Sequence, residues 1–311
     1  MFDWARGSML KQLVERKLFF SEWKRDDWLM NWHTPWLLGL IEFTPGMSVL
    51  DVGSSAPHLM LHLRETYGCD VHALDAQAAD ANKANFGFQG DTAERFPGVE
   101  LHVGFAGDDL LPAEKFDLVT CISALEHTYD HATPLQAERP MPHLHALRDM
   151  ARMLKPGGVL LMNWDLYLDN MPQKFGYDFE MDFQYLRASG LRLVTNRRRL
   201  RSTPYLFCHP ETLWFDPYQV LGFKLGALRR GTAINMLWRK PGTVSRVRLA
   251  PRPGLEGFYF PDDETRLEPD VPGSPEPPTE EIDKRFRQLI AFLTDVLGRT
   301  DVDGPTIEAP A

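Results

Sequence analysis

The chain has 311 residues, of which 43% are hydrophobic and 25% are charged, and its formal net charge is −9. This length allows one large α/β domain with appended segments, and the composition is ordinary for a globular protein. The sequence lacks an apolar run near the roughly 20 residues of a membrane-spanning helix, and its three cysteines have no motif spacing. We therefore expect a cytoplasmic protein with reduced thiols and no stable membrane insertion.

The order of apolar and helical patterns predicts four regions. Residues 1–45 are rich in aromatic residues at helical spacing and are predicted to form an N-terminal helical cap. Residues 46–240 alternate short apolar strands with helices, which predicts a doubly wound α/β fold with a mostly parallel seven-stranded sheet, Rossmann-like, covered on both faces. A linker rich in proline and acids over 241–281 and a C-terminal amphipathic helix over 282–298 complete the chain.

Within the central region the predicted strands follow the apolar runs, and the helices lie between them. Proline and glycine at 155–158 predict a tight turn after one helix. Another helix is predicted to begin at Pro57, with Ser55 or Ala56 as its cap. The predicted strands are 47–52, 70–75, 99–104, 116–122, 159–164, 191–195 and 232–239, and the predicted helices are 57–67, 76–85, 144–154 and 179–188.

Charge is distributed unevenly along the chain. Residues 191–252 contain 13 lysines and arginines but only two acids, Glu211 and Asp216, so the rest of the chain carries a net charge of −20. Much of this basic segment falls in 197–231, which interrupts the last two predicted strands. A basic field favours an anionic partner, although a solvated rim around an insertion explains the same charges.

The first predicted strand and its turn, SVLDVGSS at 48–55, are typical of a nucleoside-cofactor site. A strand that ends at Gly53 and leads into a helix lets a ligand approach the backbone. Asp75 follows at the tip of the next strand, where a carboxylate accepts hydrogen bonds from two ribose hydroxyls. A dinucleotide site requires further glycines for its pyrophosphate, and this turn has none after Gly53.

Four motifs in this order resemble those of class I S-adenosylmethionine-dependent methyltransferases: VLDVGSS, HALD, FDLVTCISALEH and ARMLKPGGVLLM. The resemblance covers about residues 30–240 and implies S-adenosylmethionine as the cofactor. A Pro-Trp pair upstream of the first strand is similar to a branch that acts on glycans and small metabolites.

The resemblance implies a set of cofactor-binding residues. Asp51 or a nearby carbonyl holds the methionyl ammonium, and Ser123 lies beside the methionyl portion. Asp108 is favoured over Phe105 near the adenine amino group, because only the acid accepts hydrogen bonds from it. The full predicted set is Asp51, Gly53, Ser54, Ser55, Asp75, Asp108 and Ser123.

An oxygen acceptor must lose a proton, and a histidine has a suitable pKa for this step. His127 at the end of the fourth strand, with Glu126 beside it, is the candidate catalytic pair, although a purely structural histidine fits the same position. His127 and His131 are four residues apart, but no motif places a third ligand, so no metal is expected.

These features predict an S-adenosylmethionine-dependent methyltransferase that methylates an oxygen of a sugar, a glycan or an anionic small metabolite. The insertion at 197–231 is the expected acceptor lid. Two alternatives remain open: an inactive binding or regulatory module, suggested by the GSSAP turn, and an RNA-directed methyltransferase that uses the basic insertion. Nucleic acid is the less favoured partner, and the sequence identifies no partner for the C-terminal helix.

Overall fold

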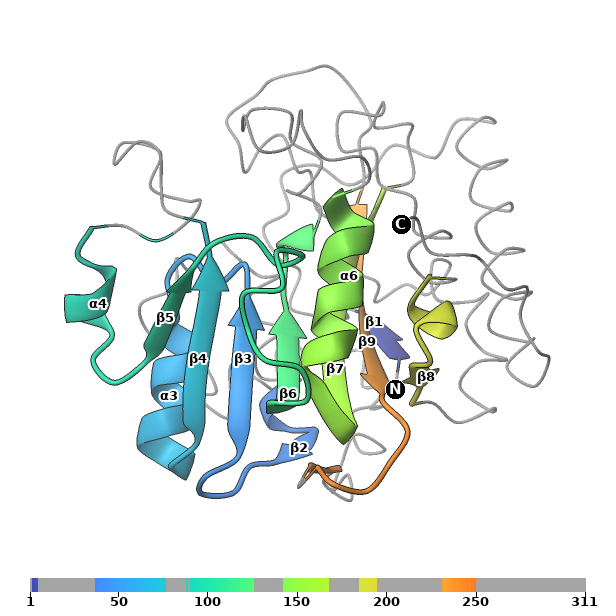
Figure 1. Ribbon diagram of the computed structural model, residues 1–311, viewed down its shortest axis with the longest axis horizontal. Helices are drawn as coiled ribbons and strands as arrows, with labels where there is room; N and C mark the ends of the chain where they lie inside the picture. Colours follow the sequence, from blue (N-terminus) through green and yellow to red (C-terminus); the bar gives the residue numbers. More distant parts are fainter. Residues whose placement is uncertain are drawn as a thin grey trace, which may run out of the picture.

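The computed structural model describes residues 2–4, 37–76, 88, 90–125, 142–167, 185–194, 231–245 and 247–249. The described strands form one main sheet and a separate pair, with helices on both faces of the main sheet (Figure 1). The helices are α3 (His58–Tyr67), α4 (Thr92–Arg95) and α6 (Pro142–Met153). The strands are β1 (Phe2–Trp4), β2 (Ile41–Glu42), β3 (Ser48–Val52), β4 (Asp70–Asp75), β5 (Glu100–Val103), β6 (Phe116–Cys121), β7 (Leu154–Tyr167), β8 (Arg192–Leu193), β9 (Gly231–Arg239) and β10 (Arg248–Leu249).

The main sheet has the order β1-β9-β7-β6-β3-β4-β5, and β8 also pairs with β9. Strands β5, β4, β3, β6 and β7 are parallel, whereas β9 is antiparallel to β7, β8 and β1. The predicted doubly wound, mostly parallel sheet is therefore confirmed. Eight described strands fill seven positions, because β1 and β8 pair with successive stretches of the same edge of β9.

Two hydrophobic clusters, one on each face, hold the sheet between its helices. The first joins Leu50, Val119 and Leu160 of the strands to Leu147 and Met150 of α6. On the other face, strand residues such as Val49, Leu118 and Leu161 pack with Leu59 and Leu63 of α3. Alternate residues of β3, β6 and β7 thus face opposite helices, which explains why apolar residues occur at consecutive positions in these strands.

The first βαβ unit agrees with its prediction except at the helix cap. Strands β3 and β4 and the end of α3 at Tyr67 match the predicted elements, and Gly68 ends the helix in the left-handed conformation (φ 69°). The predicted cap at Ser55 or Ala56 is wrong. Pro57 occupies the N-cap, and its side chain has no hydrogen-bonding group, so the helix begins without a side-chain cap hydrogen bond.

The predicted turn at 155–158 is instead the irregular beginning of β7. The Gly157 amide donates to the Lys240 carbonyl over 2.9 Å, and the Lys240 amide donates to the Gly158 carbonyl over 2.9 Å. Gly157 keeps a positive φ of 86°, and the register against β6 shifts at this point. Glycine is needed for the local conformation, but pairing with the distant residue 240 makes the segment part of the sheet.

Residues 241–249 also differ from their predicted place in the linker. The Ser245 hydroxyl donates to Asp117, Val247 is buried, and β10 pairs with β2. The described structure therefore extends beyond residue 240, while residues 246 and 250–281 of the predicted linker lie outside the described residues.

The described parts of the predicted N-terminal cap contain two strands, β1 and β2, together with a short helical stretch at 37–38. The predicted helix over 179–188 is described, and helical, only at 185–188. Most of the predicted helix over 76–85, the insertion at 197–230 and the helix over 282–298 lie outside the described residues. Among the described helices, none is long and apolar enough to cross a membrane.

Candidate active site at the carboxyl edge of the sheet

The candidate site lies where the carboxyl ends of β3, β4, β6 and β7 meet. Strand β3 has β4 on one side and β6 on the other. The chain first adds β4 and β5 on one side of β3 and then adds β6 and β7 on the other side, so the strand order reverses between β3 and β6. In open α/β sheets a ligand binds beyond the strand ends at such a reversal. The predicted cofactor residues lie at, or just beyond, the carboxyl ends of β3, β4, β5 and β6.

The turn after β3 depends on the glycine at position 53. Gly53 has a φ of 74°, and its amide donates to the Leu74 carbonyl over 2.8 Å. A Cβ atom at this position would lie 2.2 Å from the Cβ of Ala124, which follows β6. Only glycine combines this conformation with such a close approach of the two turns.

Asp51 is a buried carboxylate without a described cationic partner. It accepts hydrogen bonds from the Ser54 and Thr120 hydroxyls, each over 2.6 Å. Burial is the main reason that the pKa of Asp51 rises from its ordinary value of 3.8 to about 6; the two hydrogen bonds oppose this rise and the nearby Asp75 adds to it. A cation placed beside this carboxylate would therefore offset the free-energy cost of keeping the buried group ionised.

Asp75 at the tip of β4 is tied to the turn after β3. Its Oδ2 accepts the Ser55 amide over 2.7 Å, and its Oδ1 accepts the Ala76 amide over 2.7 Å. Ser55 has a φ of 44°, which turns its amide toward Asp75.

Ser123, which follows β6, is held by Asn163 of β7. Its amide donates to the Asn163 Oδ1 over 2.6 Å, and the Asn163 Nδ2 donates to its hydroxyl over 3.2 Å. Asn163 and Thr120 are two residues that the sequence prediction missed. Both are buried polar positions within otherwise apolar strands, and that interruption is the signal that identifies them.

Asp108 lies in the loop that follows β5, and this loop begins at Gly104, whose amide donates to the Asp75 carbonyl over 2.9 Å. The loop is anchored to α6, because the Gly107 amide donates to Asp149 over 3.0 Å and Asp109 pairs with Arg152. Asp108 is half-buried, and Phe105 packs against the first hydrophobic cluster. The role of Asp108 near the adenine stays a prediction.

The candidate catalytic residues Glu126 and His127 lie outside the described residues, as does His131. Residue 125 is the last described position after β6, so the chain reaches 126 from the edge that carries Asp51 and Ser123. Their catalytic roles remain predictions.

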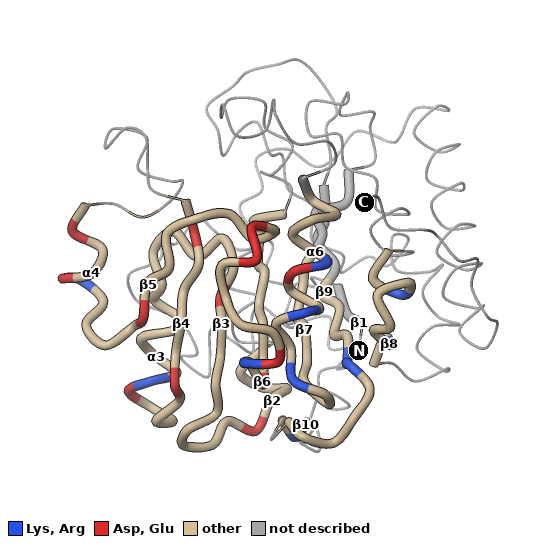
Figure 2. The backbone as a smooth tube through the Cα atoms, viewed as in Figure 1, with Lys and Arg blue, Asp and Glu red and all other residues tan. Residues whose placement is uncertain are grey.

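The hydrogen bonds of the first turn suit one type of cofactor better than another. The Gly53 and Ser55 amides both donate to acceptors of the protein, so they do not form the cluster of open amides that a pyrophosphate requires. The edge instead presents carboxylates, and acidic residues mark the tip of β4 while basic residues lie around the lower part of α6 (Figure 2). Buried Asp51 and the tip residue Asp75 fit a ligand with an ammonium group and a ribose diol.

This sheet order and this edge define a class I S-adenosylmethionine-dependent methyltransferase, with S-adenosylmethionine as the cofactor. A family model described as a methyltransferase domain matches residues 35–201, more than half of the chain, and the protein belongs to that family. No curated protein matches the chain.

Several solved structures are similar to this chain at low identity. The [4+2]-cyclase SpnF is 16% identical, with 76% of this chain and 94% of that chain covered and a TM-score of 0.46. Haemonchus contortus phosphoethanolamine N-methyltransferase 2, in complex with S-adenosyl-L-methionine, is 16% identical; the match covers 64% of this chain and 50% of that chain, with a TM-score of 0.42. A TehB-like SAM-dependent methyltransferase from Corynebacterium glutamicum is 17% identical, with 63% and 81% covered and a TM-score of 0.37.

Proposed function

We propose that this methyltransferase transfers a methyl group to an oxygen of a sugar, a glycan or an anionic small metabolite. The observation that carries the proposal is the pairing of Gly231 with Tyr167, at the carboxyl end of β7. Strand β9 is antiparallel to β7, so the chain enters β9 at the same edge of the sheet as Asp51 and Asp75. The basic insertion ends at that entry and is therefore connected to the active-site edge.

In this proposal the basic residues of the insertion are the reason that the enzyme prefers an anionic acceptor. Its cluster RRRLR at 197–201 and the pair Arg229 and Arg230 bracket the segment that leads to Gly231. A carboxylate or phosphate on the acceptor is the natural partner for such arginines. We extend the proposal to a cytoplasmic location, since Cys69 and Cys121 are buried cysteines outside any disulfide, as expected in a reducing compartment.

Each cofactor-binding residue has one task in the proposed site. Asp51 would bind the ammonium group and Asp75 the two ribose hydroxyls, while Ser123 lies beside the methionyl portion and Asp108 accepts from the adenine amino group. S-adenosylmethionine supplies an activated methyl group when bound. The protein's contribution is then to position the acceptor in line and to exclude water.

His127 is the proposed general base. A neutral imidazole at the end of β6 would take the proton of the acceptor hydroxyl as the oxygen becomes a nucleophile, and Glu126 would stabilise the resulting imidazolium. This assignment predicts that His127 affects transfer without affecting cofactor affinity, because a general base acts on the acceptor and not on the cofactor.

Methyl-labelled S-adenosylmethionine tests the proposal when it is incubated with the protein and fractionated acceptors: neutral sugars, phosphorylated or carboxylated sugars and metabolites, and RNA. We expect label in the anionic sugar or metabolite fraction. His127→Ala should reduce transfer by roughly 100-fold or more while S-adenosylhomocysteine binds as before, and His131→Ala is the matched control. Label found only in RNA, or transfer unchanged in His127→Ala, would overturn the proposal.

A further inference from the structure

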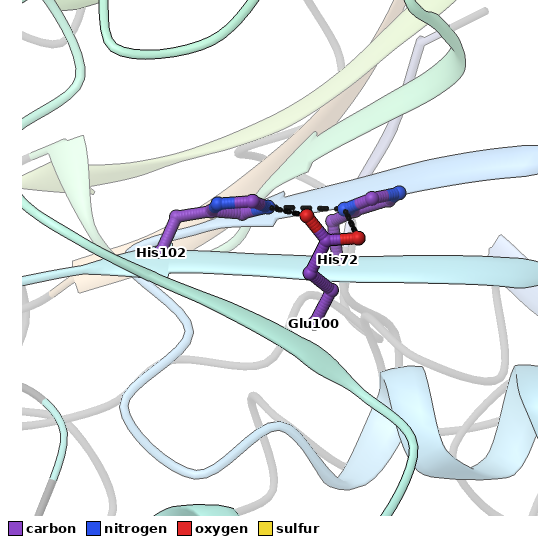
Figure 3. Close-up of side chains that lie close together, drawn as sticks. All are labelled: His72, Glu100 and His102. Carbon is purple, nitrogen blue, oxygen red and sulfur yellow. Dashed lines mark hydrogen bonds and ion pairs between the residues drawn. The ribbon is translucent and has the colours of Figure 1, made fainter.

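Three potential metal ligands converge at the side of the sheet, on β4 and β5. His72 lies in the middle of β4 and is paired in register with Glu100, while His102 lies two residues farther along β5. The side chains of Glu100 and His102 project toward His72, with the Glu100 carboxylate turned to both imidazoles (Figure 3). His72 is 1% exposed, His102 is 18% exposed and Glu100 is 59% exposed, so the group can be reached from solvent on the Glu100 side.

The distance between the two imidazole nitrogens, and the distance from each of them to its nearer Glu100 carboxylate oxygen, are close to the ligand separations around a small metal ion. His72 Nδ1 lies 3.0 Å from His102 Nε2 and 3.3 Å from Glu100 Oε2, and His102 Nε2 lies 3.4 Å from Glu100 Oε1. Ligands at the usual Zn–N and Zn–O distances of about 2.0–2.1 Å occupy tetrahedral corners that are roughly 3.3 Å apart. One ion can therefore contact all three donors with only small side-chain adjustments.

A fourth residue fixes the orientation of the buried imidazole. Asp70 Oδ2 lies 3.4 Å from His72 Nε2 and also accepts the Ser48 hydroxyl over 3.4 Å. A carboxylate beside Nε2 favours the tautomer with its proton on that nitrogen, which leaves the Nδ1 lone pair directed toward His102 and Glu100. Carboxylate support of this kind is characteristic of histidines that bind metals.

A hydrogen-bonded histidine pair is the alternative explanation of the group. Such a pair needs one proton between two nitrogens, and a second proton on the rings would let one imidazole pair with Glu100. A divalent cation satisfies the lone pairs of all three side chains together and balances the charge of the glutamate. The convergence of three donors and the supporting Asp70 favour the metal.

We propose that His72, Glu100 and His102 form a binding site for a divalent transition metal, with Zn²⁺ as the best match and solvent as the fourth ligand. The site lies within β4 and β5 and does not include the cofactor residues. It would fasten the short edge strand β5 to β4, the strand that ends at Asp75. This inference does not rest on the proposed acceptor, and its test requires neither cofactor nor acceptor.

Zn²⁺ binding to the tag-free, chelator-treated full chain tests the site, measured by calorimetry and by bound-metal analysis after dialysis. We expect one Zn²⁺ per chain, a rise in Tm of several degrees with saturating metal, and the visible absorption of tetrahedral Co²⁺ when Co²⁺ replaces it. His102→Ala should weaken Zn²⁺ affinity roughly 100-fold or more and abolish the Tm shift. Glu100→Gln should weaken affinity while the protein keeps its fold, since this side chain is largely exposed.

Two matched controls separate this site from other metal-binding side chains. His62→Ala and Glu65→Gln, on α3, should bind Zn²⁺ as the wild type does. Absence of Zn²⁺ binding in the wild type would overturn the proposal. It would also fail if His102→Ala and Glu100→Gln retained one tightly bound Zn²⁺, or if the ion were lost only in a His127→Ala, His131→Ala double variant.

Discussion

Two buried aspartates on neighbouring strands, Asp51 of β3 and Asp117 of β6, have different partners. The difference distinguishes the carboxyl edge of the sheet, which carries the candidate site, from the amino edge. Asp117, at the amino end of β6, is fully buried and accepts from Lys155 Nζ over 2.7 Å, the Ser48 amide over 3.1 Å and the Ser245 hydroxyl over 3.0 Å. Asp51, at the carboxyl end of β3, has only the hydroxyls of Ser54 and Thr120 as hydrogen-bond partners among the described residues.

The comparison shows how one residue type serves two purposes. Asp117 joins β6 to β3, to the start of β7 and to the segment that follows β9, with a lysine to balance its charge. Asp51 remains without a described counter-ion in a buried position, which is costly for the free protein and useful only if a cationic ligand arrives. The amino edge is therefore complete in the protein itself, whereas we propose that the cofactor completes the carboxyl edge.

The largest effect is expected from Asp117→Ala. Removing this carboxylate leaves Lys155 without its ion-pair partner and leaves the buried Ser48 amide without its acceptor, so we expect a loss of about 3–5 kcal/mol in the free energy of unfolding. Urea denaturation measures the change. Asp91→Ala, which removes an exposed acid 4.0 Å from Arg95, should change stability little and is the matched control. A loss below about 1 kcal/mol for Asp117→Ala would show that the amino edge is not held in this way.

The substitution Asp51→Asn is expected to raise the free energy of unfolding, by less than Asp117→Ala lowers it. The folded protein raises the pKa of Asp51 to about 6, so ionising this residue costs stability progressively as the pH rises from about 4 to 6, and the full cost persists above that range. The amide that replaces the carboxyl group cannot ionise. The variant should therefore gain up to about 2–3 kcal/mol relative to the wild type at pH 7.5, and this gain should largely disappear near pH 4.

Chemical unfolding of the wild type and Asp51→Asn at several pH values measures this dependence. A stability difference that stays constant between pH 4 and 7.5 would contradict the raised pKa of Asp51. The same variant should bind S-adenosylmethionine more weakly, because it lacks the charge that complements the ammonium group.

Local sequence patterns were sufficient to predict the centre of the fold. Strands β3, β4 and β6 are apolar runs bounded by glycine or charged residues, and each matches its predicted range within about one residue. The turn predicted at 155–158 was wrong because hydrogen bonds to Lys240, more than 80 positions away, make it part of the sheet. Periodicity within a short window contains no information about such a partner.

The same limit applies to the polar sites. The positions of Asp51, Gly53 and Asp75 follow from the order of strand, turn and strand along the chain. Thr120 joins the site only because β6 lies next to β3 in a particular register. His72 and His102 are 30 residues apart and meet only because β5 pairs with β4. Contacts set by cross-strand register require the structure.

Calorimetric titration of S-adenosylmethionine into the wild type and Asp75→Ala tests the central claim most directly, with thermal unfolding to show that both proteins are folded. The carboxylate at the tip of β4 is expected to accept the two ribose hydroxyls, and hydrogen bonds to a charged group are strong. The account predicts binding by the wild type and a loss of roughly 100-fold or more in affinity for Asp75→Ala. Equal affinity in the two proteins, or no binding by the folded wild type, would contradict it.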